Sequence, residues 1–152
     1  MSNNIVIQSS NGTKIGELVL KNYYQPTWSP SKADFFLVYY NLDLHGEKKT
    51  NNRYFTNKYV INEKYLALQE FVVKASEKDL DNQNTQLVVI DLEHKQQSII
   101  SRIEHGYVTP VEFTTNAILY TKSKVGQGSL HSHFEATLAD IKNWEPIGLT
   151  NK

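Results

Sequence analysis

The 152-residue sequence contains no cysteine, only four prolines, and no excess of either charge. Without cysteine the chain has no disulfide, no thiolate zinc ligand and no cysteine nucleophile. Lys and Arg together number 16, as do Asp and Glu, so the formal net charge is zero. A nucleic-acid-binding domain or a polybasic membrane-surface protein carries a basic excess, so we expect neither class.

Long apolar runs are also missing. The run nearest the N-terminus, Ile5 to Ile7, has three residues, whereas a secretory signal needs about 7–15 and a membrane span about 20. We therefore expect a cytoplasmic protein. The chain has 14 asparagines, and Arg53 and Arg102 are its only arginines. This bias indicates an AT-rich bacterial genome.

The composition and the hydrophobic pattern predict a single all-β domain over residues 1–152. Hydrophobic residues make up 39% of the chain, enough for a folded core, and the length is typical of one domain. Short apolar, β-branched and aromatic segments alternate with Asn, Asp, Gly or Lys clusters. The main predicted strands span residues 34–40, 64–73, 85–92, 97–101, 108–113, 117–121 and 133–141. The predicted core consists of Phe36, Val38, Leu66, Leu68, Leu87, Val89, Val111, Phe113, Ile118 and Tyr120.

The two ends of the chain carry more local signals. Residues 5–9 and 14–20 are predicted to form a hairpin, because Asn11-Gly12 between them tolerates the positive φ angles of a two-residue type I′ turn. Residues 134–142 have apolar residues at spacings of four and three. This segment is therefore compatible with an amphipathic helix as well as with a strand.

Three segments share an apolar run, an aspartate, a Leu or Ile, and a polar turn. Their aspartates are Asp43, Asp91 and Asp140, separated by 48 and 49 residues. We expect each to accept hydrogen bonds from the backbone of the turn that follows. A strand-rich period of this length is typical of β-propeller blades, and the units resemble such blades. The resemblance implies antiparallel blade-like meanders in a compact β-sandwich or a small incomplete propeller-like array.

No catalytic motif is present. The chain has no Gly-x-Ser-x-Gly elbow, and Gly126-x-Gly128 lacks the third glycine of a nucleotide-binding loop. On a strand, His131 and His133 would share a face with Glu135, a pattern compatible with a metal site. Because a glycine-rich loop precedes them, we interpret this segment instead as a solvated loop or a strand edge. We predict a protein that is not an enzyme and that holds no metal or cofactor.

An acidic cluster is one candidate for contact with a protein partner. Glu77, Asp79 and Asp81 lie in a polar connection between two predicted strands. The cluster lacks the glycine and the terminal glutamate of a calcium-binding loop. Carboxylates on a loop can instead attract a basic surface of a partner and accelerate association.

An aromatic cluster is the second candidate. Tyr23, Tyr24 and Trp28 lie close together in a predicted loop, and such side chains are enriched in protein interfaces. A small, neutral, cysteine-free chain rich in Asn and Lys, with no catalytic motif, resembles the immunity proteins of interbacterial toxins. The resemblance implies one protein partner, a toxin domain, which the chain neutralises by direct binding.

Two alternatives remain open at this stage. The chain is also compatible with a small-ligand or carbohydrate-binding domain, in which Trp28, Trp144 and tyrosines serve as stacking platforms. A metal-dependent hydrolase built on His131 and His133 is the other alternative. The oligomeric state does not follow from the sequence.

Overall fold

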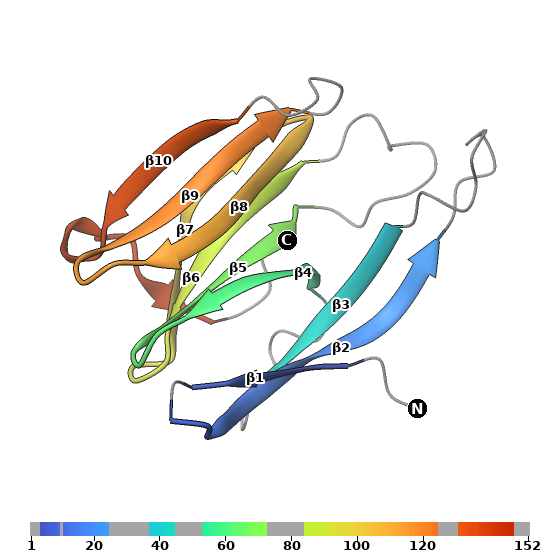
Figure 1. Cartoon of the computed structure of the whole chain (residues 1–152), viewed down its shortest axis with the longest axis horizontal. Helices are drawn as coiled ribbons and strands as arrows, with labels where there is room; N and C mark the ends of the chain where they lie inside the picture. Colours follow the sequence, from blue (N-terminus) through green and yellow to red (C-terminus); the bar gives the residue numbers. More distant parts are fainter. Residues whose placement is uncertain are drawn as a thin grey trace.

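The computed structural model describes residues 4–9, 11–24, 37–44, 53–72, 84–124 and 131–147. This part of the chain forms eleven β-strands and one short 3-10 helix (Figure 1). The elements are β1 (Ile5–Gln8), β2 (Lys14–Tyr24), β3 (Leu37–Leu44), β4 (Tyr54–Ile61), β5 (Tyr65–Phe71), β6 (Thr85–Asp91), β7 (Gln96–Ile103), β8 (Gly106–Phe113), β9 (Ala117–Lys124), β10 (Ser132–Thr137), η3 (Leu138–Asp140) and β11 (Glu145–Pro146). The predicted all-β class is confirmed. No helix among these residues is long and apolar enough to cross a membrane.

The strands form two antiparallel sheets. The large sheet has the order β1-β2-β3-β4-β5-β6-β7-β11, and the small sheet has the order β10-β9-β8. A single residue pair, Tyr40 with Phe55, joins β3 to β4. In Figure 1, β1–β3 lie on one side of β5–β7 and the small sheet lies on the other. Of the two arrangements that the sequence leaves open, the chain adopts the β-sandwich.

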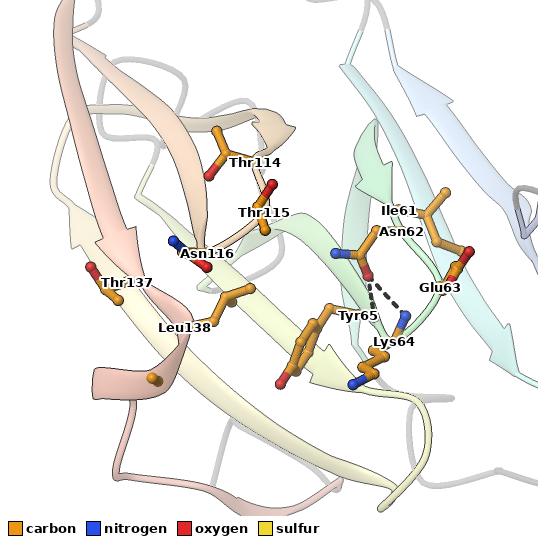
Figure 2. Close-up of a pocket in the computed structure, with 11 residues that line it drawn as sticks. Ile61, Asn62, Glu63, Lys64, Tyr65, Thr114, Thr115, Asn116, Thr137 and Leu138 are labelled. Atoms are coloured by element: carbon orange, nitrogen blue, oxygen red, sulfur yellow. Dashed lines mark hydrogen bonds between the residues drawn. The ribbon is translucent and has the colours of Figure 1, made fainter.

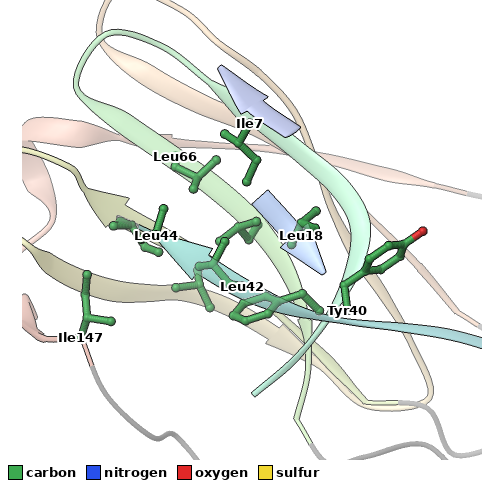
Figure 3. Close-up of a cluster of buried hydrophobic side chains, with 11 residues drawn as sticks. Ile7, Leu18, Tyr40, Leu42, Leu44, Leu66 and Ile147 are labelled. Atoms are coloured by element: carbon green, nitrogen blue, oxygen red, sulfur yellow. The ribbon is translucent and has the colours of Figure 1, made fainter. Parts of the chain in front are cut away.

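Strands β5 and β6 are buried on both faces. Side chains alternate between the two faces of a strand, and here each face contacts a different apolar cluster. The first cluster joins β5 and β6 to β1–β3 and includes Ile7, Leu18, Leu42, Leu66 and Val88 (Figure 3). The second joins them to the small sheet and includes Ala67, Leu87, Val89, Val108, Ile118 and Tyr120. This double burial explains why these two segments read as continuous apolar runs in the sequence.

A buried ion pair lies within the large sheet. Arg53, just before β4, and Glu70 of β5 are both fully buried. The guanidinium binds the carboxylate through two hydrogen bonds, Nε to Oε2 at 2.7 Å and Nη2 to Oε1 at 2.8 Å. Its Nη1 donates to Oε1 of Gln97 on β7 at 2.5 Å. The paired geometry compensates two charges that would otherwise be costly to bury.

Glutamines extend this network to the neighbouring strands. Gln86 Nε2 on β6 donates to Glu70 Oε1 at 2.8 Å, and Gln86 Oε1 accepts from Arg102 Nη2 at 2.7 Å. On the other side, Gln97 Nε2 donates to Glu145 Oε1 of β11 at 3.0 Å. Both arginines of the chain therefore serve to hold β4–β7 and β11 together.

The predicted core is largely confirmed, with one error. The buried members are Leu66, Leu68, Leu87, Val89, Ile118 and Tyr120, and Phe113 is half-buried. Val111 is 46% exposed. The register of β8 on β9 shifts between Pro110 and Glu112, which makes Val111 the extra residue of a bulge and reverses the alternation of side chains. Phe36 and the side chain of Val38 lie outside the described residues.

The predicted type I′ turn is also wrong in detail. Gly12 has φ of 88°, but Asn11 does not have a positive φ. The Gly12 N–H donates to the Ser9 carbonyl at 2.9 Å, and the Ser9 N–H donates to the Thr13 carbonyl at 2.9 Å. The hairpin is present, and among the described residues of its connection Gly12 alone has a positive φ.

The three repeated aspartates occupy different structural positions. Asp43 lies inside β3 and pairs with Glu17. Asp91 ends β6, and its Oδ1 accepts from the backbone N–H groups of Glu93 and His94 at 3.0 Å each. Asp140 belongs to η3, so residues 134–142 begin as a strand and end in a helical turn. The expected aspartate-capped turn is found at Asp91, whereas the turn after Asp43 lies outside the described residues. Strands β4 and β11 were not predicted.

The buried ion pair leads to a stability prediction. Arg53→Met should lower the free energy of unfolding by about 3–5 kcal/mol, because it leaves the Glu70 carboxylate buried without its cation. The double change Arg53→Met with Glu70→Met should recover much of that loss. Urea unfolding followed by circular dichroism measures both.

Arg102→Met is the matched control for that prediction. Arg102 is exposed and reaches the same network from the surface, so its loss should cost about 1 kcal/mol or less. Equal destabilisation by the two arginine changes would contradict the proposed importance of the buried pair.

Candidate protein-binding surface

Strand β10 is the outer strand of the small sheet, on the side away from β8 (Figure 1). Five of its six residues are exposed, and only Ala136 is half-buried. It pairs with β9 in an uninterrupted register from Ser132 opposite Lys122 to Thr137 opposite Ala117. The strand is therefore regular, paired on one side and solvent-facing.

The turn at the end of β10 shows which of its residues direct their backbone N–H and C=O groups toward β9. The Leu138 N–H donates to the Asn116 carbonyl at 2.8 Å, and hydrogen-bonded pairs alternate along an antiparallel ladder. The residues of β10 that bond to β9 are therefore Ser132, Phe134 and Ala136. The backbone N–H and C=O groups of His133, Glu135 and Thr137 point away from β9, into the free edge.

The opposite edge of the small sheet, at β8, is covered. Gln69 Nε2 of β5 donates to the Val108 carbonyl at 2.9 Å, and the Val108 N–H donates to Thr85 Oγ1 at 2.9 Å. Thr85 Oγ1 in turn donates to the Gly106 carbonyl at 3.0 Å. No corresponding contact covers β10 among the described residues. Proteins normally protect exposed strand edges, so the open edge is a candidate for pairing.

An aromatic ladder lies along this edge. Phe134 is 39% exposed, and its ring stacks on Tyr120 with a centroid distance of 5.5 Å and an interplanar angle of 16°. Lys122 Nζ lies 4.9 Å from the centroid of the Phe134 ring, a favourable cation–π geometry. The Phe134 side chain is therefore held in place but only partly covered.

A second exposed apolar side chain, Val111, lies on the outward face of the small sheet. Leu119, His133 and Glu135 alternate with residues that face the core, so they lie on the outward face. With Val111 and the neighbouring segments of β9 and β10 they line an open hollow of about 380 Å³. An apolar centre bordered by charged and polar groups is typical of a protein-contact surface.

The two histidines considered as metal ligands lie on this surface. His131, just before β10, and His133 are both exposed. In the part of the chain that the structure describes, no three His, Cys, Asp or Glu side chains come close enough to hold a metal ion. His133 and Glu135 lie on the solvent-facing side of the edge strand β10, so of the two sequence interpretations, a solvated loop or a strand edge, the structure shows the strand edge.

A larger hollow of about 920 Å³ lies at the turn end of the sandwich (Figure 2). The β4–β5 turn, the β8–β9 turn and the start of η3 line it. Asn62 Oδ1 accepts from the backbone N–H groups of Lys64 at 2.9 Å and Tyr65 at 2.7 Å. The Tyr65 ring lies between Trp144, at 6.1 Å, and Phe113, at 6.2 Å. These aromatic rings therefore pack against one another within the protein.

Most of the residues predicted to contact a partner lie outside the part of the chain that the structure describes. Trp28, Glu77, Asp79 and Asp81 lie outside the described residues. Tyr23 and Tyr24 lie in β2, where they pair with Val38 and Leu37 of β3; their side chains are also outside the described part. The exposed groups that the sequence analysis missed are Val111 and Phe134. A bulge and an uncovered edge produce them, and neither has a clear local signal.

The turn after β6 contains an ion pair between Asp91 and His94 that shifts the pKa of both groups. His94 Nδ1 lies 2.9 Å from Asp91 Oδ2. The hydrogen bond and the charge of Asp91 raise the pKa of His94 above 6.5. Partial burial acts to raise the pKa of Asp91, but hydrogen bonds from His94 and Glu93 and the charge of His94 together hold it below 3.8.

No protein-family model, curated protein or solved structure matches this chain.

The Asp91–His94 pair predicts a pH-dependent stability. The raised pKa of His94 gives a contribution that is present below pH 6.5 and is lost as the pH rises through the folded value. The lowered pKa of Asp91 gives a contribution that is present above pH 3.8 and is lost as the pH falls through its folded value. Asp91→Asn should return the His94 pKa toward 6.5, measured by an NMR titration of the ring protons.

Glu93→Gln is the control for this titration. Glu93 affects His94 only as a minor charge contribution, at 4.0 Å from Nδ1. It should therefore lower the His94 pKa less than Asp91→Asn does. An unchanged His94 pKa in Asp91→Asn would show that the pair does not form in solution.

Proposed function

We propose that this chain is a non-catalytic protein-binding domain that acts as a bacterial immunity protein. Its partner is a toxin domain, which it neutralises by direct binding. The single observation that carries the protein-binding role is the exposed apolar surface at Val111 on a sheet that packs tightly on β5 and β6. The toxin as partner follows from the resemblance described in the sequence analysis.

The small sheet is suited to recognition without a change of shape. Its inward side packs on β5 and β6 through Val108, Ile118 and Tyr120. Polar contacts from Gln69 and Thr85 hold β8 in place. A surface built on such a support loses little conformational entropy when a partner binds, so more of the contact free energy contributes to affinity.

Val111 is the natural centre of such a contact. The side chain is 46% exposed because it lies on the outward side of β8, opposite to the buried Val108 and Pro110, and the bulge returns the following Phe113 to the inward side. Leu119, His133 and Glu135 surround it along the hollow. A partner that covers this hollow would bury the apolar groups and meet charged groups at the rim, the usual arrangement of a protein interface.

The residues predicted from the sequence to contact the partner are also part of this proposal: the aromatic residues Tyr23, Tyr24 and Trp28, and three acidic residues. Glu77, Asp79 and Asp81 would attract a basic toxin surface and accelerate association. By occupying the toxin's active site, or by holding the toxin in an inactive form, the bound chain prevents catalysis and needs no chemistry of its own.

The packing of the aromatic residues favours this function over carbohydrate binding. A sugar-binding site needs aromatic rings that are free to stack on the ligand. Trp144 is instead stacked on Tyr65, with an interplanar angle of 18°, and Tyr65 also contacts Phe113. These rings contribute to the second apolar cluster.

The function is tested with the tagged chain and lysate of its own organism. Val111→Lys should weaken capture of the main partner by about tenfold or more, because the interface would bury an unpaired ammonium group. The protein should remain folded, since Val111 lies outside the core. Mass spectrometry identifies the partner, which we expect to be a large secreted protein or its C-terminal fragment. Growth assays test whether the chain suppresses its toxicity.

Val6→Lys provides a matched control. Val6 lies on β1 and is 45% exposed, so it has nearly the same exposure as Val111 but lies at the far end of the large sheet. The control should capture the partner as the unmodified chain does. Equal capture by both variants would exclude the Val111 surface, and the absence of any specifically retained protein would contradict the protein-binding role.

A further inference from the structure

The free edge of β10 is complementary to itself. The outward-pointing backbone groups belong to His133, Glu135 and Thr137, as derived from the register with β9. A second antiparallel strand can form hydrogen bonds with this edge only if the residues whose backbone groups point toward it lie opposite these three residues. A second copy of β10 meets this condition in a small set of registers, which differ in their side-chain pairs.

One register brings favourable pairs together at every central position. When Phe134 lies opposite Phe134 of the second copy, His133 lies opposite Glu135 of the second copy, and Glu135 opposite its His133. The two His–Glu pairs lie on the outward face, and the two phenylalanines lie on the other. An imidazole can donate a hydrogen bond to a carboxylate that lies opposite it, and aromatic pairs stabilise neighbouring strands.

The neighbouring registers are less favourable. A register centred on Glu135 places two carboxylates opposite each other, which is destabilising. A register centred on His133 places two imidazoles opposite each other and leaves Phe134 opposite Ser132. The sequence of the edge therefore selects the register centred on Phe134.

The environment of Phe134 supports the same register. Phe134 bonds to β9 through its backbone, so Phe134 of the two copies would form a non-hydrogen-bonded pair, in which side chains lie closer together. Each ring already stacks on its own Tyr120 at 5.5 Å. Pairing would continue the aromatic ladder across the edge and cover the exposed 39% of Phe134.

The space beside the strand is open to a partner. A second hollow, of about 420 Å³, borders β10 and is lined by Glu135 to Thr137, by Ile99 and Ile100 of β7, and by residues 140–143. No hydrogen bond from another described element reaches the outward backbone groups of β10. A second strand can therefore approach along the edge.

We propose that two copies of this chain associate through β10, antiparallel and with the two-fold axis at Phe134. The two small sheets then become one continuous six-stranded sheet, in the order β8-β9-β10-β10-β9-β8. The proposal goes beyond the protein-binding function and does not require the toxin. Val111 lies on β8, and the hollow beside it extends to His133 and Glu135 near the axis, so the dimer presents two adjoining hollows on one face and can bind a partner with two sites more tightly.

A charge exchange tests the dimer and its register. Sedimentation of the full chain over a range of concentrations should show a mass approaching twice 17.5 kDa, with dissociation on dilution, because one strand pair makes a small interface. His133→Glu should weaken dimerisation by about tenfold, since it creates two Glu–Glu pairs. The double variant His133→Glu with Glu135→His should restore it, because each carboxylate again lies opposite an imidazole that can donate a hydrogen bond to it.

Cross-linking tests the axis directly, because the chain has no cysteine of its own. Phe134→Cys should form a disulfide-linked dimer on mild oxidation, since a non-hydrogen-bonded pair brings the two Cα atoms to about 4.5 Å, within disulfide range. Ala136→Cys is the matched control and should stay largely unlinked, because it lies opposite Ser132 of the second copy.

Each outcome bears on the proposal. A monomer at all concentrations overturns it, as does a dimer that His133→Glu leaves intact, which would assign association to another surface. Restoration by the double variant and selective cross-linking of Phe134→Cys support it. Capture of a toxin by a monomeric chain would retain the protein-binding function and reject the dimer, so the two proposals can fail separately.

Discussion

The burial of β5 and β6 on both faces is the constraint on which the rest of the structure depends. Two adjacent strands with continuous apolar runs need cover on each side, because side chains alternate between the faces. Strands β1–β3 cover one face and the small sheet covers the other. The Arg53–Glu70 pair and its glutamines lie within this arrangement and tie β4–β7 together. The network leaves no described buried side-chain polar atom without a partner.

The same constraint produces the candidate surface. The small sheet must place one side on β5 and β6, so its other side faces solvent, and its two edges are treated differently. Side chains of the large sheet reach β8 and satisfy its backbone. No described side chain of the large sheet donates to or accepts from the backbone of β10 in the same way. Exposure of Phe134 and of the strand edge is therefore a consequence of how the core is closed.

Sequence patterns predicted the elements whose signals are local. The runs that became β5, β6 and β9 are apolar and bounded by polar turns, so their strands and buried residues could be inferred. Asp91 was expected to hold the turn after its strand, and it does so. Strand β4 has no clear pattern, because polar residues such as Arg53 and Thr56 are buried in and beside it. The repeat of aspartates did not correspond to equivalent positions, since the same short pattern can end a strand, lie within one or form a helical turn.

The sequence by itself determined that the chain is neutral, cysteine-free and rich in strands, because composition and periodicity express these properties residue by residue. It also marked His131, His133 and Glu135 as one side of a strand, since that spacing is local. Only the tertiary structure decided that Val111 is exposed, that Arg53 and Glu70 meet, and that β10 has a free edge. These features depend on a bulge and on contacts between strands far apart in the chain, and no local pattern carries that information.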